Sequence, residues 1–353
     1  MKNPPTMDER LVNRVAERVL LESLHLTEGE NVTIEAWNNG LPFAQRTLVR
    51  ARRLGAVPVL LFEDEESYVE GLRGAPKAIV GKMGRHEYAL LSATDAYVFI
   101  PGPLLGGSPK LSREEVVAYT RYNSSWYKAA KSARLRGVRL TFGYAGEEMA
   151  RVLRRSLPDI VEHQLKASLV DFRKIRLTGM RLARQMERGA KVTVRAEGEE
   201  LNFELGRGEE IDDGMVDRKD VAAGNNMTNV PPGYLAREIA KETLSGTVRL
   251  HAPLPRLGTS ADVRLDFAKG RLKAWKSEED QEWLDALVRM MPEERRTFSD
   301  VLLGLNPSMN YGYAQDRLVE GAVTVFGMFQ GTTKKGSLEV NGRLLVDEGK
   351  LLA

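Results

Sequence analysis

The sequence changes character near residue 190, and this change limits the folds that the chain can adopt. Before that point, short apolar segments alternate with segments of helical periodicity; the apolar segments are Val32–Ala36, Val57–Phe62, Ala96–Ile100 and Val138–Phe142. Strands that alternate with helices in this way favour an open, largely parallel α/β sheet.

From Lys191 onward, strand-like segments follow one another directly, with a helix after Ser277. The expected strands are Lys191–Ala196, Leu201–Leu205, Thr247–Leu250, Val263–Phe267, Arg271–Trp275, Ala322–Met328, Leu338–Val340 and Arg343–Val346. We therefore predict an α/β protein of two domains. Residues 1–187 form an open parallel α/β domain, and residues 188–353 form a mixed, β-rich α+β domain.

Composition excludes several classes of protein. The 353 residues are 42% hydrophobic and 29% charged, which is typical of a globular protein, and no apolar run approaches the ~20 residues that cross a bilayer. The first residues, MKNPPTMDERLV, do not resemble a signal peptide, so we expect a cytoplasmic protein with no membrane partner. The absence of Cys excludes disulfides, thiolate metal sites and a Cys nucleophile.

Charge and motifs give no sign of nucleic acid or nucleotide binding. The formal net charge is +3, from 52 basic and 49 acidic residues, so no nucleic-acid partner is expected. Neither phosphate-binding glycine motif, GxGxxG or GxxxxGK[ST], occurs in a suitable context.

The segment Asn229–Leu250, NVPPGYLAREIAKETLSGTVRL, is the first candidate for part of a functional site. It opens with a Pro-Pro-Gly turn and has a second turn at Ser245-Gly246, followed by the alternating strand pattern of Thr247–Leu250. Turns beside a sheet can hold site residues in place, although a surface loop between strands has the same pattern.

This segment and residues 190–214, AKVTVRAEGEELNFELGRGEEIDDG, resemble the thermophilic aminopeptidase family of metallopeptidases, which includes aminopeptidase T. The resemblance is clearest over residues 190–353. It implies an aminopeptidase T-like fold and a homodimer built around an enclosed cavity. In the family, the Glu that follows the Gly of this segment is a metal ligand, and here Tyr234 stands at that position.

The other motifs of the family can also be followed along the chain. The resemblance places Asp300, in Phe298–Gly304, at the position of a second Glu ligand, and it places Glu320 in the acidic turn that follows. It places Ser337 and Glu339 at the positions of a His-x-Asp pair, and on a strand these two side chains share one face. The implied metal ligands are Asp300, Glu320 and Glu339, and the implied catalytic residues are Tyr234 and Glu339.

None of these positions carries a histidine. Carboxylates alone favour hard cations, so we expect at most a weakly held divalent cation and no tightly bound zinc. Of the four histidines, His251 stands out because it ends the strand after the Asn229–Leu250 segment.

Three functions remain open. The resemblance implies a metal-dependent aminopeptidase that hydrolyses peptide bonds, with a peptide or small-molecule ligand. The missing histidines favour a non-catalytic relative that acts as a binding or assembly protein. Metal-free acid–base chemistry on Tyr234, Asp300 and Glu339 is the third possibility.

Overall fold

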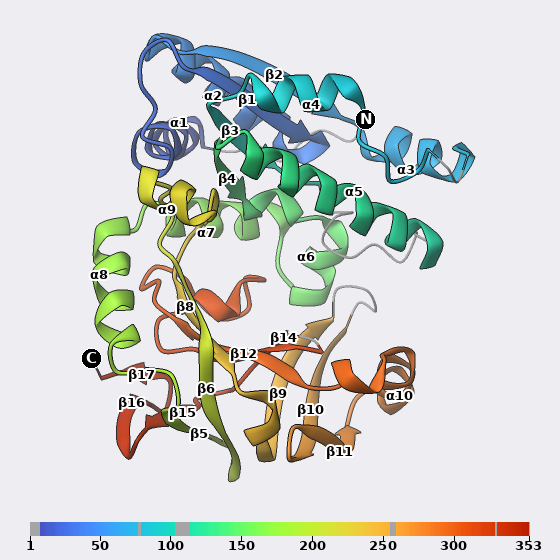
Figure 1. Cartoon of the computed structure of the whole chain (residues 1–353), viewed down its shortest axis with the longest axis vertical. Helices are drawn as coiled ribbons and strands as arrows, with labels where there is room; N and C mark the ends of the chain where they lie inside the picture. The colour runs from blue at the N-terminus through green and yellow to red at the C-terminus, as the bar shows by residue number, and fades with distance from the viewer. Residues whose placement is uncertain (1–7, 77–78, 103–112, 255–258, 329, 353) are drawn as a thin grey trace. The chain divides into compact units, whose positions relative to one another are not determined.

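The computed structural model describes residues 8–76, 79–102, 113–254, 259–328 and 330–352 (Figure 1). The chain divides into two units. The first unit consists of Met1–Ala150, Arg155–Leu169 and Gly214–Pro231. The second unit consists of Arg151–Arg154, Val170–Asp213 and Pro232–Ala353.

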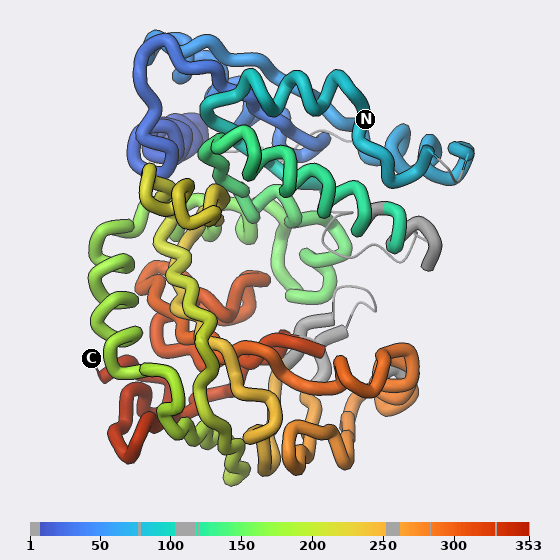
Figure 2. The backbone as a smooth tube through the Cα atoms, in the orientation of Figure 1, coloured from blue at the N-terminus to red at the C-terminus, as the bar shows by residue number. Residues whose placement is uncertain are grey.

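This division differs from the expected boundary at residue 187 in three places, the smallest of which is Arg151–Arg154 in the second unit. Helix α8 (Phe172–Ala183) belongs to the second unit, because it packs on strands β6 and β8 of that unit. Residues 214–231 return to the first unit, because strand β7 (Met227–Val230) pairs with its sheet. Figure 2 shows this returning segment in yellow.

The first unit is built on a five-stranded parallel sheet, as the strand–helix alternation predicts. Its order is β2-β1-β3-β4-β7, with bounds Val57–Glu63, Asn31–Trp37, Ala96–Ile100, Arg136–Leu140 and Met227–Val230. Strand β4 ends two residues before the expected Phe142, because a 3-10 helix, η4 (Thr141–Tyr144), begins there.

The two faces of this sheet carry different side chains. Along β1, Val32, Ile34 and Ala36 point to one face and are buried, whereas Glu35 and Trp37 point to the other face. A purely aliphatic face can only support packing. The face with the carboxylate and the indole can also support a site.

Helices cover both faces of the parallel sheet (Figure 1). Helix α2 (Leu41–Arg53) and its neighbour α1 (Glu9–Arg18), which continues as a π-helical turn η1 (Val19–Ser23), pack on the aliphatic face. Helix α5 (Arg113–Ser132) covers the other face together with α4 (Arg85–Ser92). The remaining elements of this part of the chain are η2 (Asn38–Gly40), α3 (Glu65–Gly74), α6 (Glu147–Leu153), α7 (Leu157–Ala167) and α9 (Arg218–Ala223).

The second unit is built on a twelve-stranded antiparallel sheet, which confirms the expected β-rich half. Its order is β11-β10-β9-β14-β13-β12-β8-β6-β5-β15-β16-β17. In chain order the bounds are Lys191–Ala196 (β5), Glu199–Asp212 (β6), Tyr234–Ile239 (β8), Ser245–Leu254 (β9), Thr259–Ala268 (β10), Arg271–Ser277 (β11), Phe298–Gly304 (β12), Val323–Gly327 (β13), Gln330–Thr332 (β14), Ser337–Val340 (β15), Arg343–Asp347 (β16) and Lys350–Leu351 (β17).

Strand β6 also pairs with β9, so the pairings of β6, β8, β12, β13, β14 and β9 form a closed ring. Besides α8, the helical elements of the second unit are η5 (Lys241–Thr243), α10 (Gln281–Met290), η6 (Glu293–Arg295) and η7 (Asp316–Leu318). Strand β8 lies between the Pro-Pro-Gly turn and the Ser245-Gly246 turn, where the sequence predicts no strand.

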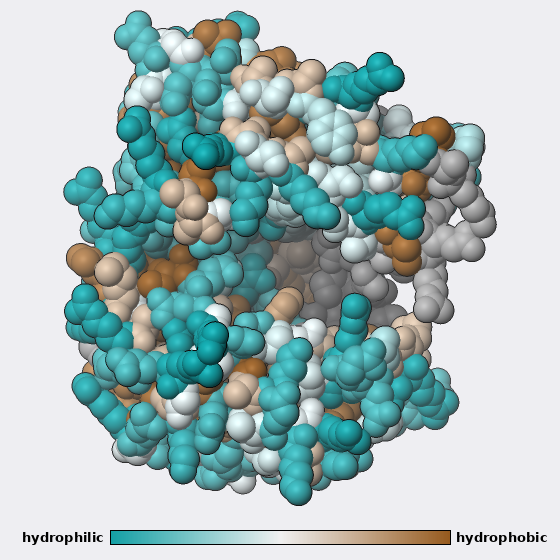
Figure 3. Space-filling view, viewed as in Figure 1, coloured by the Kyte–Doolittle hydropathy of each residue, from teal (hydrophilic) through white to brown (hydrophobic). Residues whose placement is uncertain are grey.

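Hydrophilic side chains predominate on the molecular face shown in Figure 3. Within the described part of the chain, no helix combines the length and the apolar character that a bilayer crossing requires.

Candidate functional site

The register of β8 against β12 separates two of the predicted site residues. Tyr234 pairs with Gly304 and Asp300 pairs with Glu238, so Tyr234 and Asp300 lie four residues apart along the strand pair. At about 3.3 Å per residue, their backbone positions are about 13 Å apart along the strands. Each of the two side chains also has a nearer partner.

Tyr234 is held by its neighbours in the second unit. Its hydroxyl donates a hydrogen bond of 2.7 Å to Glu210 Oε1, and Arg317 Cζ lies 5.8 Å from the centre of its ring. Burial raises the pKa of Tyr234 far above its usual range, and the charges of Asp212 and Glu210 raise it further. The phenol therefore stays protonated near neutral pH, so it can donate a proton in a hydrogen bond but does not serve as a base.

Ser337 and Glu339 lie on β15, which is separated from β8 by β5 and β6. Glu339 Oε2 accepts a hydrogen bond of 2.9 Å from Arg195 Nη1, and Ser337 Oγ donates one of 3.2 Å to Asp347 Oδ1. Both side chains are thus engaged in contacts within their own edge of the sheet.

Asp300 and Glu320 also lie in different surroundings: Asp300 is hydrogen-bonded, and Glu320 is exposed. Asp300 Oδ2 accepts a hydrogen bond of 2.6 Å from Ser299 Oγ. Glu320 is exposed in the turn before β13, and its N–H bonds to the Asn306 carbonyl at 3.2 Å. Among the residues that the structure describes, no three His, Asp or Glu side chains are grouped closely enough to hold a metal ion. The implied ligands therefore do not fit a divalent cation.

His251, on β9, belongs to a small ion-pair cluster. Its Nδ1 lies 2.9 Å from Asp262 Oδ1, and Lys334 Nζ donates to both oxygens of Asp262 at 3.1 and 2.8 Å. Lys334 and His251 together lower the pKa of Asp262 against the opposing effect of burial. The carboxylate thus joins the His251 imidazole of β9 to Lys334, which lies in the turn after β14.

A different group of residues surrounds a cavity of about 280 Å³ in the first unit, which we name the aromatic pocket. Seven aromatic side chains line it, namely Trp37, Tyr68, Phe99, Tyr122, Trp126, Tyr127 and Tyr144. Its other lining residues are Glu35, Glu63, Asn123, Arg139 and Met227. Aromatic walls with a few convergent charged groups are typical of small-molecule sites.

The aromatic pocket lies where the strand order of the parallel sheet reverses. The chain runs from β1 outward to β2 and then returns past β1 to β3. Open parallel sheets bind ligands beside such a reversal, at the carboxyl ends of the strands. Trp37 and Glu63 are the last residues of β1 and β2, and Phe99 and Arg139 are the next-to-last residues of β3 and β4.

Parallel register assembles the floor of the aromatic pocket. Glu35 pairs with Phe99, and Phe99 pairs with Arg139, so these three side chains form one row on the same face of the sheet. Helix α5 lies across that face. Its Trp126 ring centre is 5.0 Å from the centre of the Tyr97 ring of β3, nearly perpendicular to it.

Gly137 of β4 lies against the Met227 side chain, which lines the pocket. An added Cβ at Gly137 would lie 1.9 Å from Met227 Sδ of β7, so a side chain there would displace the end of Met227. Arg139, two residues along β4, donates from Nη2 to the Tyr127 hydroxyl.

Glu35 is the most perturbed carboxyl group of the aromatic pocket. Burial raises the pKa of Glu35 to about 6, although the Tyr97 hydroxyl and the Trp37 indole N–H, 3.4 Å away, both donate hydrogen bonds to it. Nearby negative charges on Glu63 and Glu87 raise it further. Burial and the Glu87 charge also raise the pKa of Glu63. Repulsion among these partly desolvated carboxylates favours the binding of a proton or of another cation.

None of the residues of the aromatic pocket was identified from the sequence. The available signal is the alternation within β1, Thr-Ile-Glu-Ala-Trp, and within β3, Tyr-Val-Phe-Ile, which puts polar and aromatic side chains on one face only. That signal marks the face, but it does not show which helix covers it.

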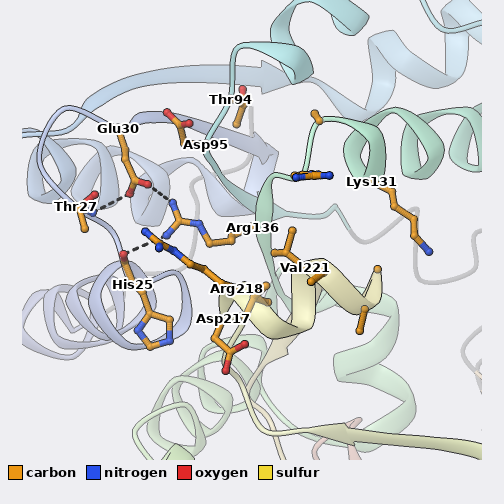
Figure 4. Close-up of a pocket in the computed structure, with 16 residues that line it drawn as sticks. His25, Thr27, Glu30, Thr94, Asp95, Lys131, Arg136, Asp217, Arg218 and Val221 are labelled. Atoms are coloured by element: carbon orange, nitrogen blue, oxygen red, sulfur yellow. Dashed lines mark hydrogen bonds and ion pairs between the residues drawn. The ribbon is translucent and has the colours of Figure 1, made fainter.

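A second, larger cavity of about 1050 Å³ lies at the amino ends of β1, β3 and β4 (Figure 4). Arg136 crosses it, bonding from Nη1 to the carbonyls of Leu24 and His25 at 2.6 and 3.1 Å and pairing with Glu30 through Nη2. Asp217 caps α9 on the other wall. These contacts join the loop after η1 to the sheet, which gives Arg136 a structural role.

Comparisons with known proteins identify the fold but no family. The sequence matches no protein-family model, and a comparison with curated proteins found no match. The structure is similar to that of wild-type AmpT, the aminopeptidase T of Thermus thermophilus, with a TM-score of 0.67 and 16% sequence identity. The match covers 98% of this chain and 100% of AmpT. The fold is therefore aminopeptidase T-like, as the sequence resemblance implies, and identity at this level supports the fold alone.

Proposed function

We propose that this chain uses an aminopeptidase T-like fold to bind a small molecule in the aromatic pocket, without hydrolysing peptides. The observation that carries the proposal is the pocket itself. It combines seven aromatic side chains with Glu35 and Glu63 at the carboxyl ends of the strands where the sheet order reverses.

The second unit supports the non-hydrolytic part of the proposal. Glu339 is paired with Arg195, Tyr234 is held as a phenol by Glu210, and Asp300 lies at the opposite end of the β8–β12 pair. Peptide hydrolysis at a metal requires about three protein ligands around one ion. The separate positions of these residues therefore support a function other than metal-dependent hydrolysis.

A metal-dependent aminopeptidase is the alternative function, favoured by the similarity to AmpT along nearly the whole chain. It would need Asp300, Glu320 and Glu339 to share a divalent cation, with Tyr234 and Glu339 acting in catalysis. That arrangement would require the Arg195–Glu339 pair to separate.

Two measurements on the purified full chain decide between these functions. In the first, the fluorescence of the four Trp residues, of which Trp37 and Trp126 line the pocket, is followed while small cationic, neutral and anionic molecules are titrated in turn. We expect a saturable change with at least one of them, and no response from any of them would overturn the proposal.

The second measurement is hydrolysis of aminoacyl nitroanilides with zinc, cobalt, manganese or magnesium added. We expect no turnover. Metal-dependent turnover that is lost in Glu339→Ala but retained in the exposed-site control Glu66→Ala would instead establish the aminopeptidase.

A further inference from the structure

We infer that the ligand of the aromatic pocket is an organic cation, a substituted ammonium group carried by a small molecule. This inference rests on the proposed binding function and adds the chemical class of the ligand. It depends on three features of the pocket: the arrangement of its rings, the sign of its charge and its size.

Two pairs of rings that line the aromatic pocket meet at steep angles. The Trp37 and Tyr68 ring centres are 4.9 Å apart with the planes at 66°, and those of Trp126 and Tyr127 are 5.3 Å apart at 86°. Seven rings around one cavity make an aromatic cage. The negative face of an aromatic ring attracts a cation within about 6 Å of its centre, and aromatic cages recognise quaternary ammonium groups.

Charge selects against an anion. Glu35 and Glu63 line the pocket, and Glu87 lies close enough for its charge to affect both. A bound cation relieves the repulsion among these carboxylates, whereas an anion would increase it. The guanidinium of Arg139 is the basic group in the lining, and it is hydrogen-bonded to Tyr127.

The oxygens of Glu35 are already oriented. The Tyr97 hydroxyl and the Trp37 indole donate to its two carboxylate oxygens, one to each, and Trp37 is almost completely buried. A carboxylate held in this way cannot turn freely to wrap around a metal ion. It can attract a diffuse alkylammonium charge, which needs no fixed coordination geometry.

Volume limits the ligand to a small head group. At about 280 Å³, the cavity lies near the lower end of the range for ligand pockets, roughly 300–1,000 Å³. A trimethylammonium or a short alkylamine group fits such a space.

The inference also predicts how binding depends on pH. The groups that face Glu35 are Glu63 from β2, Glu87 from α4, Tyr97 from β3, Tyr122 from α5 and Arg139 from β4. Both tyrosines keep their protons at these pH values, because burial raises the pKa of Tyr97 and of Tyr122. Glu35, with a pKa of about 6, and Glu63, whose pKa is also raised, therefore gain negative charge as pH increases, and cation affinity should rise as pH increases through about 6.

The test compares choline with dimethylbutanol, its neutral carbon isostere, by calorimetry on the full chain. Near pH 8, we expect choline to bind at least about tenfold more tightly than dimethylbutanol. Tyr68→Leu keeps an apolar side chain but removes a ring, and it should weaken choline binding; Tyr88→Leu, on the exposed face of α4, should not. Glu35→Gln should weaken choline binding near pH 8 and have little effect near pH 5.

The outcomes separate this inference from the proposed function. If dimethylbutanol bound as well as choline, or an anion bound better, the pocket would be a binding site but not a cation site. If choline binding were unaffected by both Tyr68→Leu and Glu35→Gln, the cation would be binding elsewhere, and the inference would fail. If no small molecule of any charge bound, the proposed function itself would fail.

Discussion

At the scale of single residues, Glu35 combines its proposed binding role with a cost to stability. The folded state holds the pKa of Glu35 at about 6, above the usual 4.5, so the folded protein binds this proton more tightly than the unfolded chain does. Its contribution to stability is therefore complete at acidic pH and is lost as pH rises from about 4.5 to about 6.

Glu35→Gln should remove this pH dependence. We expect its free energy of unfolding to match that of the parent near pH 4 and to exceed it near pH 8 by on the order of 1–2 kcal/mol. Urea unfolding at both pH values measures the difference, and Glu66→Gln, at an exposed position of α3, serves as the control. A variant that is less stable than the parent near pH 8 would show that the charged form is the one the fold favours.

Tyr234 provides a second residue-scale prediction. Tyr234→Phe removes the 2.7 Å hydrogen bond to Glu210 and keeps the ring near Arg317. We expect a loss of about 1 kcal/mol in unfolding free energy and no change in ligand binding to the aromatic pocket. Impaired binding in this variant would indicate that the family position is functional after all.

At the scale of elements, the end of β12 shows how closely the second sheet is packed. Gly304 bonds through its N–H to the Ala322 carbonyl at 2.8 Å and accepts from the Gly321 N–H at 3.0 Å. An added Cβ would lie 1.9 Å from the Val319 carbonyl oxygen, which is backbone and cannot rotate away.

Gly304→Ala should therefore destabilise the protein by about 1–3 kcal/mol, with the shift read from the urea midpoint. Gly71→Ala in α3 is the matched control, since its added Cβ meets no atom within 4 Å. Replacing Gly by Ala inside a helix stabilises it by about 1 kcal/mol. Equal effects of the two substitutions would contradict the close approach at Gly304.

At the scale of the whole molecule, the return of the chain through β7 makes the two halves interdependent. A fragment ending at residue 187 lacks β7 and leaves the edge of β4 unpaired. We expect this fragment to aggregate or to show no cooperative thermal transition, because an open edge and uncovered apolar surface remain. Co-expression with residues 188–353 should restore folding, and a cooperative transition in the fragment alone would count against this.

Association is also a whole-molecule property. From the family resemblance we propose a homodimer, so light scattering after size exclusion should give about twice the 39.4 kDa chain mass. A mass of one chain at micromolar concentration would refute it.

The sequence by itself determined the class of each half of this protein. Periodicity is a local property, so residues such as Val32–Ala36 and Val263–Phe267 indicate their own strands, and the alternation of strands with helices implies a parallel sheet. The resemblance in the second half also led to the aminopeptidase T-like fold.

Only the tertiary structure decided which residues meet. Tyr234 and Asp300 stand at the positions of two ligands in the family motifs, but the β8–β12 register places them at opposite ends of the strand pair. Glu35 and Trp126 are about ninety residues apart and carry no shared motif, yet they line one cavity because α5 crosses the polar face of β1 and β3. Register and helix docking depend on contacts between distant segments, and no local pattern records them.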